Sequence, residues 1–247
     1  MEQVISYLSL FIGALLGGIW ILYWQKPTEK VLKLIIVFGG AFLFATCFLD
    51  LIPSIFEHAL IDFNRIQPQK AFFTSFFVLL GFLINIIFEQ FSHYDEHNPD
   101  LNNVKSTKSS SLLLLLALSI HAYLEGFPIY INDQPNIPMV IGIIIHNIPL
   151  SIFLVAAFRN SNFNKTQSLL LLCVFASMAI LGSLTKQLVV FLGNYDTYIT
   201  AFVIGILLHV CFTTLYDNNE DKKYNLQRLI IIIVAFAFVI LLPDNFH

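Results

Sequence analysis

The stretch SLLLLLALSIHAYLEGFPIYI, residues 111–131, indicates the solvent in which this chain folds. It is long enough to cross the hydrocarbon core of a bilayer, which takes about 20 apolar residues. It also contains His121 and Glu125, although a charged side chain at the centre of a membrane costs roughly 2.5–3.5 kcal/mol on insertion scales. Ionisable residues at such depth usually belong to a functional site. The stretch therefore predicts a transmembrane helix that carries such a site.

The composition of the whole chain agrees with a membrane protein. Hydrophobic residues make up 57% of the chain and charged residues only 12%, about half the share in a typical soluble domain. Eight apolar stretches recur, so we expect an all-α, polytopic bundle of eight transmembrane helices and a polar cytoplasmic loop at 93–110. The predicted spans are 3–24, 31–56, 71–92, 111–131, 137–158, 168–192, 197–217 and 226–242. Since they leave no room for a sizeable soluble domain, residues 1–247 should form one membrane domain.

Lysine and arginine are unevenly divided between the two sides of the predicted bundle. The connections after the first, third, fifth and seventh spans carry ten of them, and the other side carries Arg65, Lys70 and Lys186. Basic residues near span ends stay in the cytoplasm. We therefore expect both termini outside, in the cell membrane, which is the inner membrane if the chain is bacterial. The net charge of −3 and the lack of a basic cluster give no reason to expect nucleic acid as a partner.

Two neighbouring spans carry the residues of the candidate site. His121 and Glu125 are four residues apart and share one helix face, and Gly126 and Pro128 follow directly. The next span, IIIHNIPLSIF at 143–153, places His146 and Asn147 just before Pro149. Two proline-interrupted helices that meet at the midplane, each with an imidazole, predict a central cation site. The alternative is a kink with an interhelical His–Glu hydrogen bond.

Further polar residues suggest a path to and from this site. They follow helical spacing toward the outer mouth in the second span and toward the inner surface in the third and seventh. The candidate path residues are Asp50, Glu57, Asn147, His209, Glu89, His93 and Asp217, with Asn85 on the same stripe as Glu89. A solvated helix end explains Glu57, His93 or Asp217 equally well when each is taken alone.

The candidate ligands indicate the kind of ion. Two imidazoles and one carboxylate suit zinc and other late divalent first-row ions. Sodium or potassium would call for carbonyl and hydroxyl oxygens, and calcium or magnesium for more carboxylates.

Four segments of the chain resemble the ZIP (Zrt/Irt-like) family of metal transporters. HAYLEG at 121–126 and HNIP at 146–149 resemble its signature helices, and GGAFLFATCFLDLIPSIFEHA at 39–59 and LLGFLINIIFEQ at 79–90 resemble its second and third helices. The resemblance implies uptake of Zn²⁺, or of Fe²⁺, Mn²⁺ or Cd²⁺, with His121, Glu125 and His146 as metal ligands. It also implies that the chain is not an enzyme and has no prosthetic group. The expected partners are the divalent ion and the lipid bilayer, with a homodimer as an open expectation.

The chain departs from that family at several positions. Leu150, Ala122 and Ala179 stand where the family often has further ligands, so we expect one ion and not two, with water or a mobile side chain in the fourth place. Two rival functions stay open. One is an intramembrane zinc-dependent hydrolase that uses His121, His146, His209 and Asp50, since three ligands and an open water position suit hydrolysis. The other is a relative that binds metal without transporting it.

Overall fold

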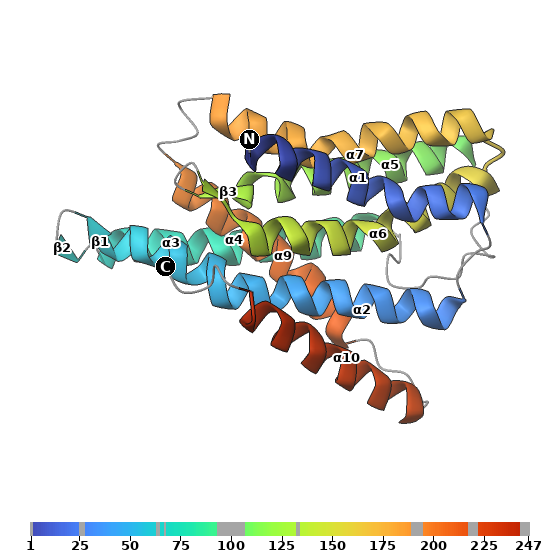
Figure 1. Cartoon of the computed structure of the whole chain (residues 1–247). Coiled ribbons are helices and arrows are strands. Elements are labelled where there is room, and N and C mark those ends of the chain that lie inside the picture. Colours follow the sequence, from blue (N-terminus) through green and yellow to red (C-terminus); the bar gives the residue numbers. More distant parts are fainter. Residues whose placement is uncertain are drawn as a thin grey trace. The chain divides into compact units, whose positions relative to one another are not determined.

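The fold is a set of long apolar helices, described here from a computed structural model (Figure 1). The structure describes residues 2–24, 28–62, 65–66, 68–92, 107–131, 134–188, 195–216 and 222–242. Within these ranges the helices are α1 (Glu2–Tyr23), α2 (Glu29–Thr46), α3 (Ile52–Leu60), α4 (Pro68–Ser92), α5 (Lys108–Glu125), α6 (Ile137–Asn160), α7 (Lys165–Leu188), α9 (Asp196–Tyr216) and α10 (Lys222–Ile240). The prediction of an all-α, polytopic protein is confirmed.

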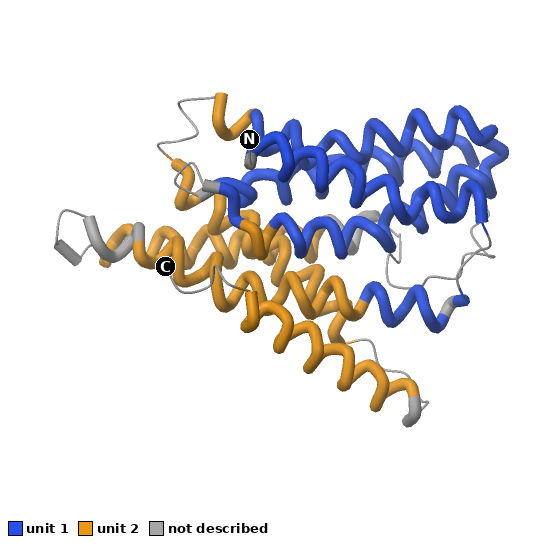
Figure 2. Tube along the Cα trace, viewed as in Figure 1, with its two compact units in different colours: residues 1–36, 98–136, 140–184 blue, residues 37–97, 137–139, 185–247 orange. Residues whose placement is uncertain are grey.

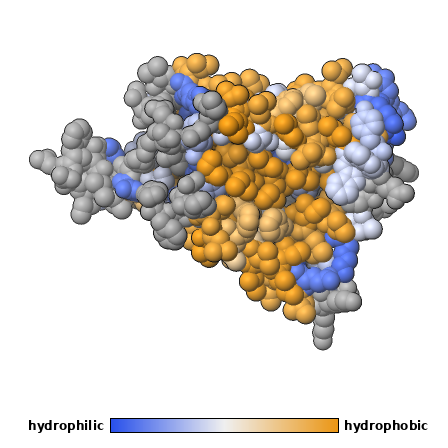
Figure 3. All heavy atoms as spheres, viewed as in Figure 1, coloured by the Kyte–Doolittle hydropathy of each residue, from blue (hydrophilic) through white to orange (hydrophobic). Residues whose placement is uncertain are grey.

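Seven helical segments in the described part of the chain are long and apolar enough to cross a membrane. One of them, Lys30–Glu57, runs through α2 and α3. The eighth predicted span corresponds to α10, whose apolar part, Tyr224–Ile240, is shorter. Large hydrophobic side chains stay exposed along α1, α4 and α10, and hydrophobic residues, in orange, make up most of the coloured part of the face in Figure 3. Such a surface is stable in lipid and not in water.

The second predicted span is one helical run with a wider turn in its middle. Residues Cys47–Leu51 form a π-helical turn between α2 and α3. Pro53 lies just beyond it and has no N–H to donate to the preceding turn, so the backbone must adjust there. A π-turn is one of the recognised ways in which a helix absorbs such a break. The turn contains Asp50, one of the predicted path residues.

Short antiparallel strand pairs close two of the connections. β1 (Ile61–Asp62) pairs with β2 (Arg65–Ile66) after α3. β3 (Tyr130–Ile131) pairs with β4 (Gln134–Pro135), with Tyr130 opposite Pro135. The second pair joins the end of the fourth span to the start of α6.

The chain divides into two compact units, coloured separately in Figure 2. Unit 1 comprises residues 1–36, 98–136 and 140–184, and unit 2 comprises 37–97, 137–139 and 185–247. All three residues of the predicted metal site belong to unit 1. The prediction that residues 1–247 form one domain stays a prediction.

Glycines allow helices to pack closely inside each unit. In unit 1, a side chain at Gly126 would overlap the Ala179 carbonyl of α7, and one at Gly182 would overlap the Tyr123 carbonyl of α5. In unit 2, Gly81 and Gly205 form the same reciprocal contact between α4 and α9. In lipid the hydrophobic effect does not drive helices together, so membrane helices associate through close van der Waals packing. Small residues allow this because they let the backbones approach.

Candidate metal centre

The helix α5 carries two of the three candidate ligands. It begins one turn earlier than predicted because Thr107 caps it, with its hydroxyl oxygen accepting a hydrogen bond from the Ser110 N–H at 3.2 Å. It ends at Glu125, and Gly126 leads into a short 3₁₀ turn, Phe127–Ile129, which contains Pro128. The predicted interruption of the fourth span is therefore present. A cation beside Glu125 would also lie near the carbonyl end of α5, where the helix dipole favours positive charge.

The helix α6 carries the third candidate ligand and differs from the prediction. The helix is continuous from Ile137 to Asn160, with Pro149 inside it. The expectation of an interrupted helix is therefore wrong for this span. Pro149 only removes the donor for the Ile145 carbonyl, and packing in a membrane bundle can keep such a helix continuous. Ser151 adds a local bond, because its hydroxyl donates to the Ile148 carbonyl at 2.8 Å.

The three candidate ligands meet in unit 1. His121 Nε2 lies 3.1 Å from Glu125 Oε1, and His146 Nε2 lies 3.7 Å from the same oxygen. The two imidazole rings are 5.8 Å apart between centroids. One ligand atom from each residue falls within 4.8 Å of the other two, and among the described residues this is the one group of three or more His, Cys, Asp or Glu close enough to share an ion.

These separations match a metal site that is nearly assembled. Around a tetrahedral ion with bonds of about 2.1 Å, neighbouring ligand atoms lie about 3.4 Å apart. The two printed nitrogen–oxygen distances, 3.1 and 3.7 Å, lie on either side of that value. Small rotations of the side chains would therefore bring all three atoms onto one ion and leave a fourth position for water.

The carboxylate of Glu125 is buried beside two imidazoles. Glu125 is 1% exposed, and among the described residues none donates an aligned hydrogen bond to either of its oxygens, although His121 Nε2 lies 3.1 Å from Oε1. Burying a carboxylate costs several kcal/mol unless it is paired or coordinates a metal. Asn147 follows His146 on α6 and is 2% exposed, and its Oδ1 accepts no hydrogen bond from the part of the chain that the structure describes. A cation at the cluster would satisfy the carboxylate.

The remaining predicted path residues differ in burial and in whether the structure describes them. Asp50 is half-buried in the π-turn, and Glu57 is exposed on α3. Glu89 belongs to α4, but its side chain lies outside the described residues. His93 and Asp217 also lie outside them.

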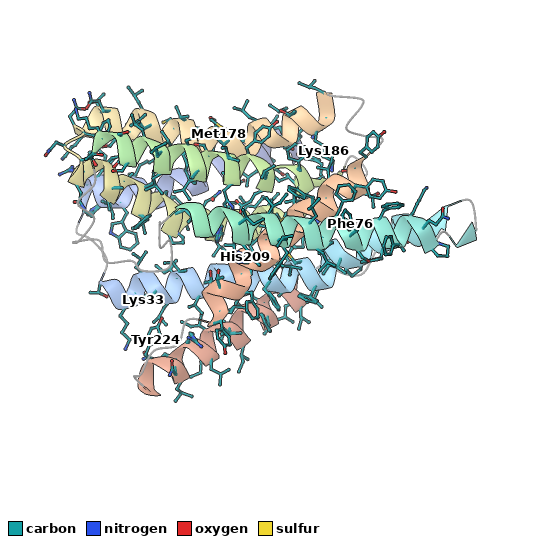
Figure 4. The ribbon with its side chains drawn as sticks, turned by 180° about the vertical axis from the view of Figure 1, so that it is seen from behind. Lys33, Phe76, Met178, Lys186, His209 and Tyr224 are labelled. Carbon is teal, nitrogen blue, oxygen red and sulfur yellow. The ribbon has the colours of Figure 1, made fainter. Side chains whose placement is uncertain are left out.

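His209 makes a contact that the sequence did not predict. It is 7% exposed on α9, where Figure 4 labels it, and its Nδ1 lies 2.9 Å from Asn85 Nδ2 of α4. The Asn85 amide can donate to this nitrogen when the imidazole is neutral and carries its proton on Nε2. The Phe82 ring also packs on the imidazole, nearly perpendicular to it, with centroids 5.1 Å apart. The sequence placed both polar residues on stripes but gave no sign that the stripes face each other.

The positions that depart from the family pattern carry apolar side chains. Ala122 is 1% exposed on α5, and Ala179 is 3% exposed on α7, where its carbonyl faces Gly126. Leu150 is half-buried, one turn beyond His146 on α6. None of these three side chains has a donor atom for a metal.

Comparison with known proteins gives two matches. The family model of the ZIP zinc transporters matches residues 95–243, which is more than half of the chain. The zinc transporter ZupT of Enterobacter sp. (strain 638) is 25% identical over 139 residues, covering 55% of this chain and 50% of that protein. This chain therefore aligns with about half the length of the curated relative that it matches. On the strength of the family match, the chain belongs to the ZIP zinc transporter family.

Proposed function

We propose that this protein carries divalent metal ions, with zinc foremost, from outside the cell into the cytoplasm through a mononuclear site. The observation that supports it most directly is the buried Glu125 carboxylate, which lies between two imidazoles and accepts no aligned hydrogen bond from the described residues. In a chain whose helices can span a membrane, such a group is stable when a cation passes or binds there. Family membership and the similarity to a zinc transporter support the same activity.

The ligand set supports zinc as the main substrate. His121, Glu125 and His146 offer two nitrogens and one carboxylate, a set that zinc binds in tetrahedral geometry. Manganese prefers more oxygen ligands, whereas cadmium, a larger and softer ion, accepts nitrogen. Iron, manganese and cadmium are therefore expected as weaker substrates or competitors. No residue of the cluster offers a second carboxylate to hold a second ion.

The decisive experiment is zinc uptake by the purified protein in liposomes. Radiolabelled zinc should accumulate in proteoliposomes and not in empty liposomes, with iron, manganese and cadmium tested as competitors. The His121→Ala protein, reconstituted at the same density, is the control for a loss of the site. Uptake that is equal in the wild type and in His121→Ala would contradict transport through this cluster.

The two rival functions have less support. A hydrolase built on His121, His146, His209 and Asp50 would need all four around one zinc, but neither His209 nor Asp50 belongs to the group that could share an ion. His209 Nδ1 is engaged instead with Asn85. A relative that binds metal without moving it would give zinc binding and no uptake, so the liposome experiment separates it. The homodimer stays a prediction.

A further inference from the structure

The side of α6 that faces away from the metal cluster is in close contact with α1. A side chain at Gly13 would meet the Ile144 side chain, and one at Gly17 would overlap the Ile148 carbonyl oxygen and Ser151 Oγ. Ile144 and Ile148 are one helical turn apart and so lie on one face of α6. His146 lies two residues from each, about 200° around the helix. The helix α6 is therefore supported by α1 on the side opposite to His146.

The contact at Gly17 differs in kind from its neighbours along α1. Gly13 faces the stiff, β-branched side chain of Ile144. Gly18 faces side chains as well, and the nearest atom is a Leu172 methyl group at the end of a flexible side chain. Gly17 faces a backbone carbonyl, which cannot move without moving α6. Any side chain at position 17 would therefore displace the α6 backbone.

The backbone of α6 is also easiest to deform at this level. Pro149 follows Ile148 directly and removes one hydrogen bond from the helix ladder. The Ile148 carbonyl that faces Gly17 is the same one that accepts the hydrogen bond from Ser151. The contact with α1 is therefore made at a turn of α6 that lacks one backbone hydrogen bond, two residues from His146.

We propose that Gly17 is a positioning residue of the metal site. Its missing side chain lets α1 lie against the Ile148 carbonyl. This contact keeps His146 Nε2 and Glu125 Oε1 at the separation that two ligands of one ion have. The present separation of 3.7 Å between His146 Nε2 and Glu125 Oε1 is close to that of two ligands on one zinc. A methyl group at position 17 would push α6 toward α5 and change this separation. The inference rests on the proposed function, because it assumes that the cluster binds a metal.

The test compares Gly17→Ala with Gly18→Ala, which adds the same methyl group to the same helix but faces side chains and not the α6 backbone. Zinc and cadmium affinities of each purified, full-length protein are measured by titration calorimetry in detergent. Gly17→Ala should weaken zinc binding by about tenfold or more, the scale of substitutions that support metal ligands from behind. The control variant Gly18→Ala should stay within about threefold of the wild type.

The ratio of cadmium to zinc affinity separates positioning from a general loss of stability. Because Gly17→Ala narrows the site, the larger cadmium ion should lose more affinity than zinc. Ser151→Ala removes the hydroxyl that lies against Gly17 and relaxes the same contact. The ratio of cadmium to zinc affinity of this variant should therefore be higher than that of the wild type. If Gly17→Ala does not fold, Ser151→Ala decides the question alone, and a ratio equal to that of the wild type overturns the inference.

The outcomes distinguish this inference from the proposed function. A wild-type protein that binds no zinc, or binds it equally well after His121→Ala, would overturn the assignment of the cluster itself. A wild type that binds zinc through His121, with Gly17→Ala indistinguishable from Gly18→Ala in affinity and in ratio, would overturn the role of Gly17 alone. Opposite shifts of the ratio in Gly17→Ala and Ser151→Ala would support it.

Discussion

At the scale of single residues, Glu125 is the centre of the cluster, since Nε2 of His121 and Nε2 of His146 both lie beside its Oε1. Glu125→Ala should abolish zinc uptake, and His121→Ala and His146→Ala should each weaken it severely, because each removes one of three protein ligands. Combining two of these changes should cost little more than one, since the ligands act as a unit. Uptake into proteoliposomes measures this, with Ser177→Ala as the control, because among the described residues the half-buried Ser177 of α7 bonds only within its own helix, to the Val174 carbonyl. Normal zinc uptake by Glu125→Ala would contradict the assignment of the metal site.

A substitution at Leu150 should strengthen zinc binding. His146 and Leu150 are four residues apart on α6, the spacing of His121 and Glu125 on α5. Leu150→Glu should therefore add a charged ligand, tighten zinc binding and slow release, because a transporter must let its ion go as well as hold it. Calorimetry gives the affinity, and single-turnover uptake gives the release rate. An unchanged affinity would mean that position 150 does not face the ion.

The number of ions follows from the same residues. Ala122, Leu150 and Ala179 supply no donor atom, so the purified protein should hold one zinc in its helical region. Anomalous scattering or metal analysis of the purified protein measures this number. Two metals about 4 Å apart, the spacing of a binuclear centre, would contradict it.

At the scale of elements, α4 and α9 are joined by a buried polar contact between Asn85 and His209. Asn85→Ala and His209→Ala should each destabilise unit 2, and the double variant should lose less than the sum. The expected coupling is about 0.6 kcal/mol, and at most about 1.7, as for hydrogen bonds between membrane helices. Thermal unfolding of the four proteins completes the cycle. Fully additive losses would mean that the contact contributes no coupling.

The sequence predicted the helices better than their local breaks. Hydropathy placed every described helix, because a bilayer requires a fixed length of apolar chain. It could not place the start of α7, where Asn164 and Gln167 form reciprocal side-chain to backbone hydrogen bonds that add a turn. The prolines were ambiguous for the same local reason: Pro53 accompanies a π-turn, whereas Pro149 sits in a continuous helix. Packing around each proline, which a single sequence does not contain, decides between these outcomes.

The candidate site was predictable where its residues share an element. The spacing of His121 and Glu125 places them on one face of any helix, and the short connection to α6 made His146 a reasonable third member. The contact between Asn85 and His209 depends on how α4 and α9 are rotated about their axes, which polar stripes on separate helices do not determine. Likewise the GALLG segment at 13–17 signals close helix packing but does not say that Gly17 meets the Ile148 carbonyl.

At the scale of the whole molecule, the distribution of charge predicts the orientation in the membrane. With ten basic residues on one side and three on the other, Ser109 at the start of α5 should face the cytoplasm and Gln3 in α1 the outside. Gln3→Cys and Ser109→Cys, each in a protein whose Cys47, Cys173 and Cys211 are changed to serine, test this with a membrane-impermeant maleimide. In intact cells Gln3→Cys should be labelled and Ser109→Cys protected. Because both side chains are exposed, opening the cells should make Ser109→Cys reactive, and the reverse pattern would invert the proposed direction of transport.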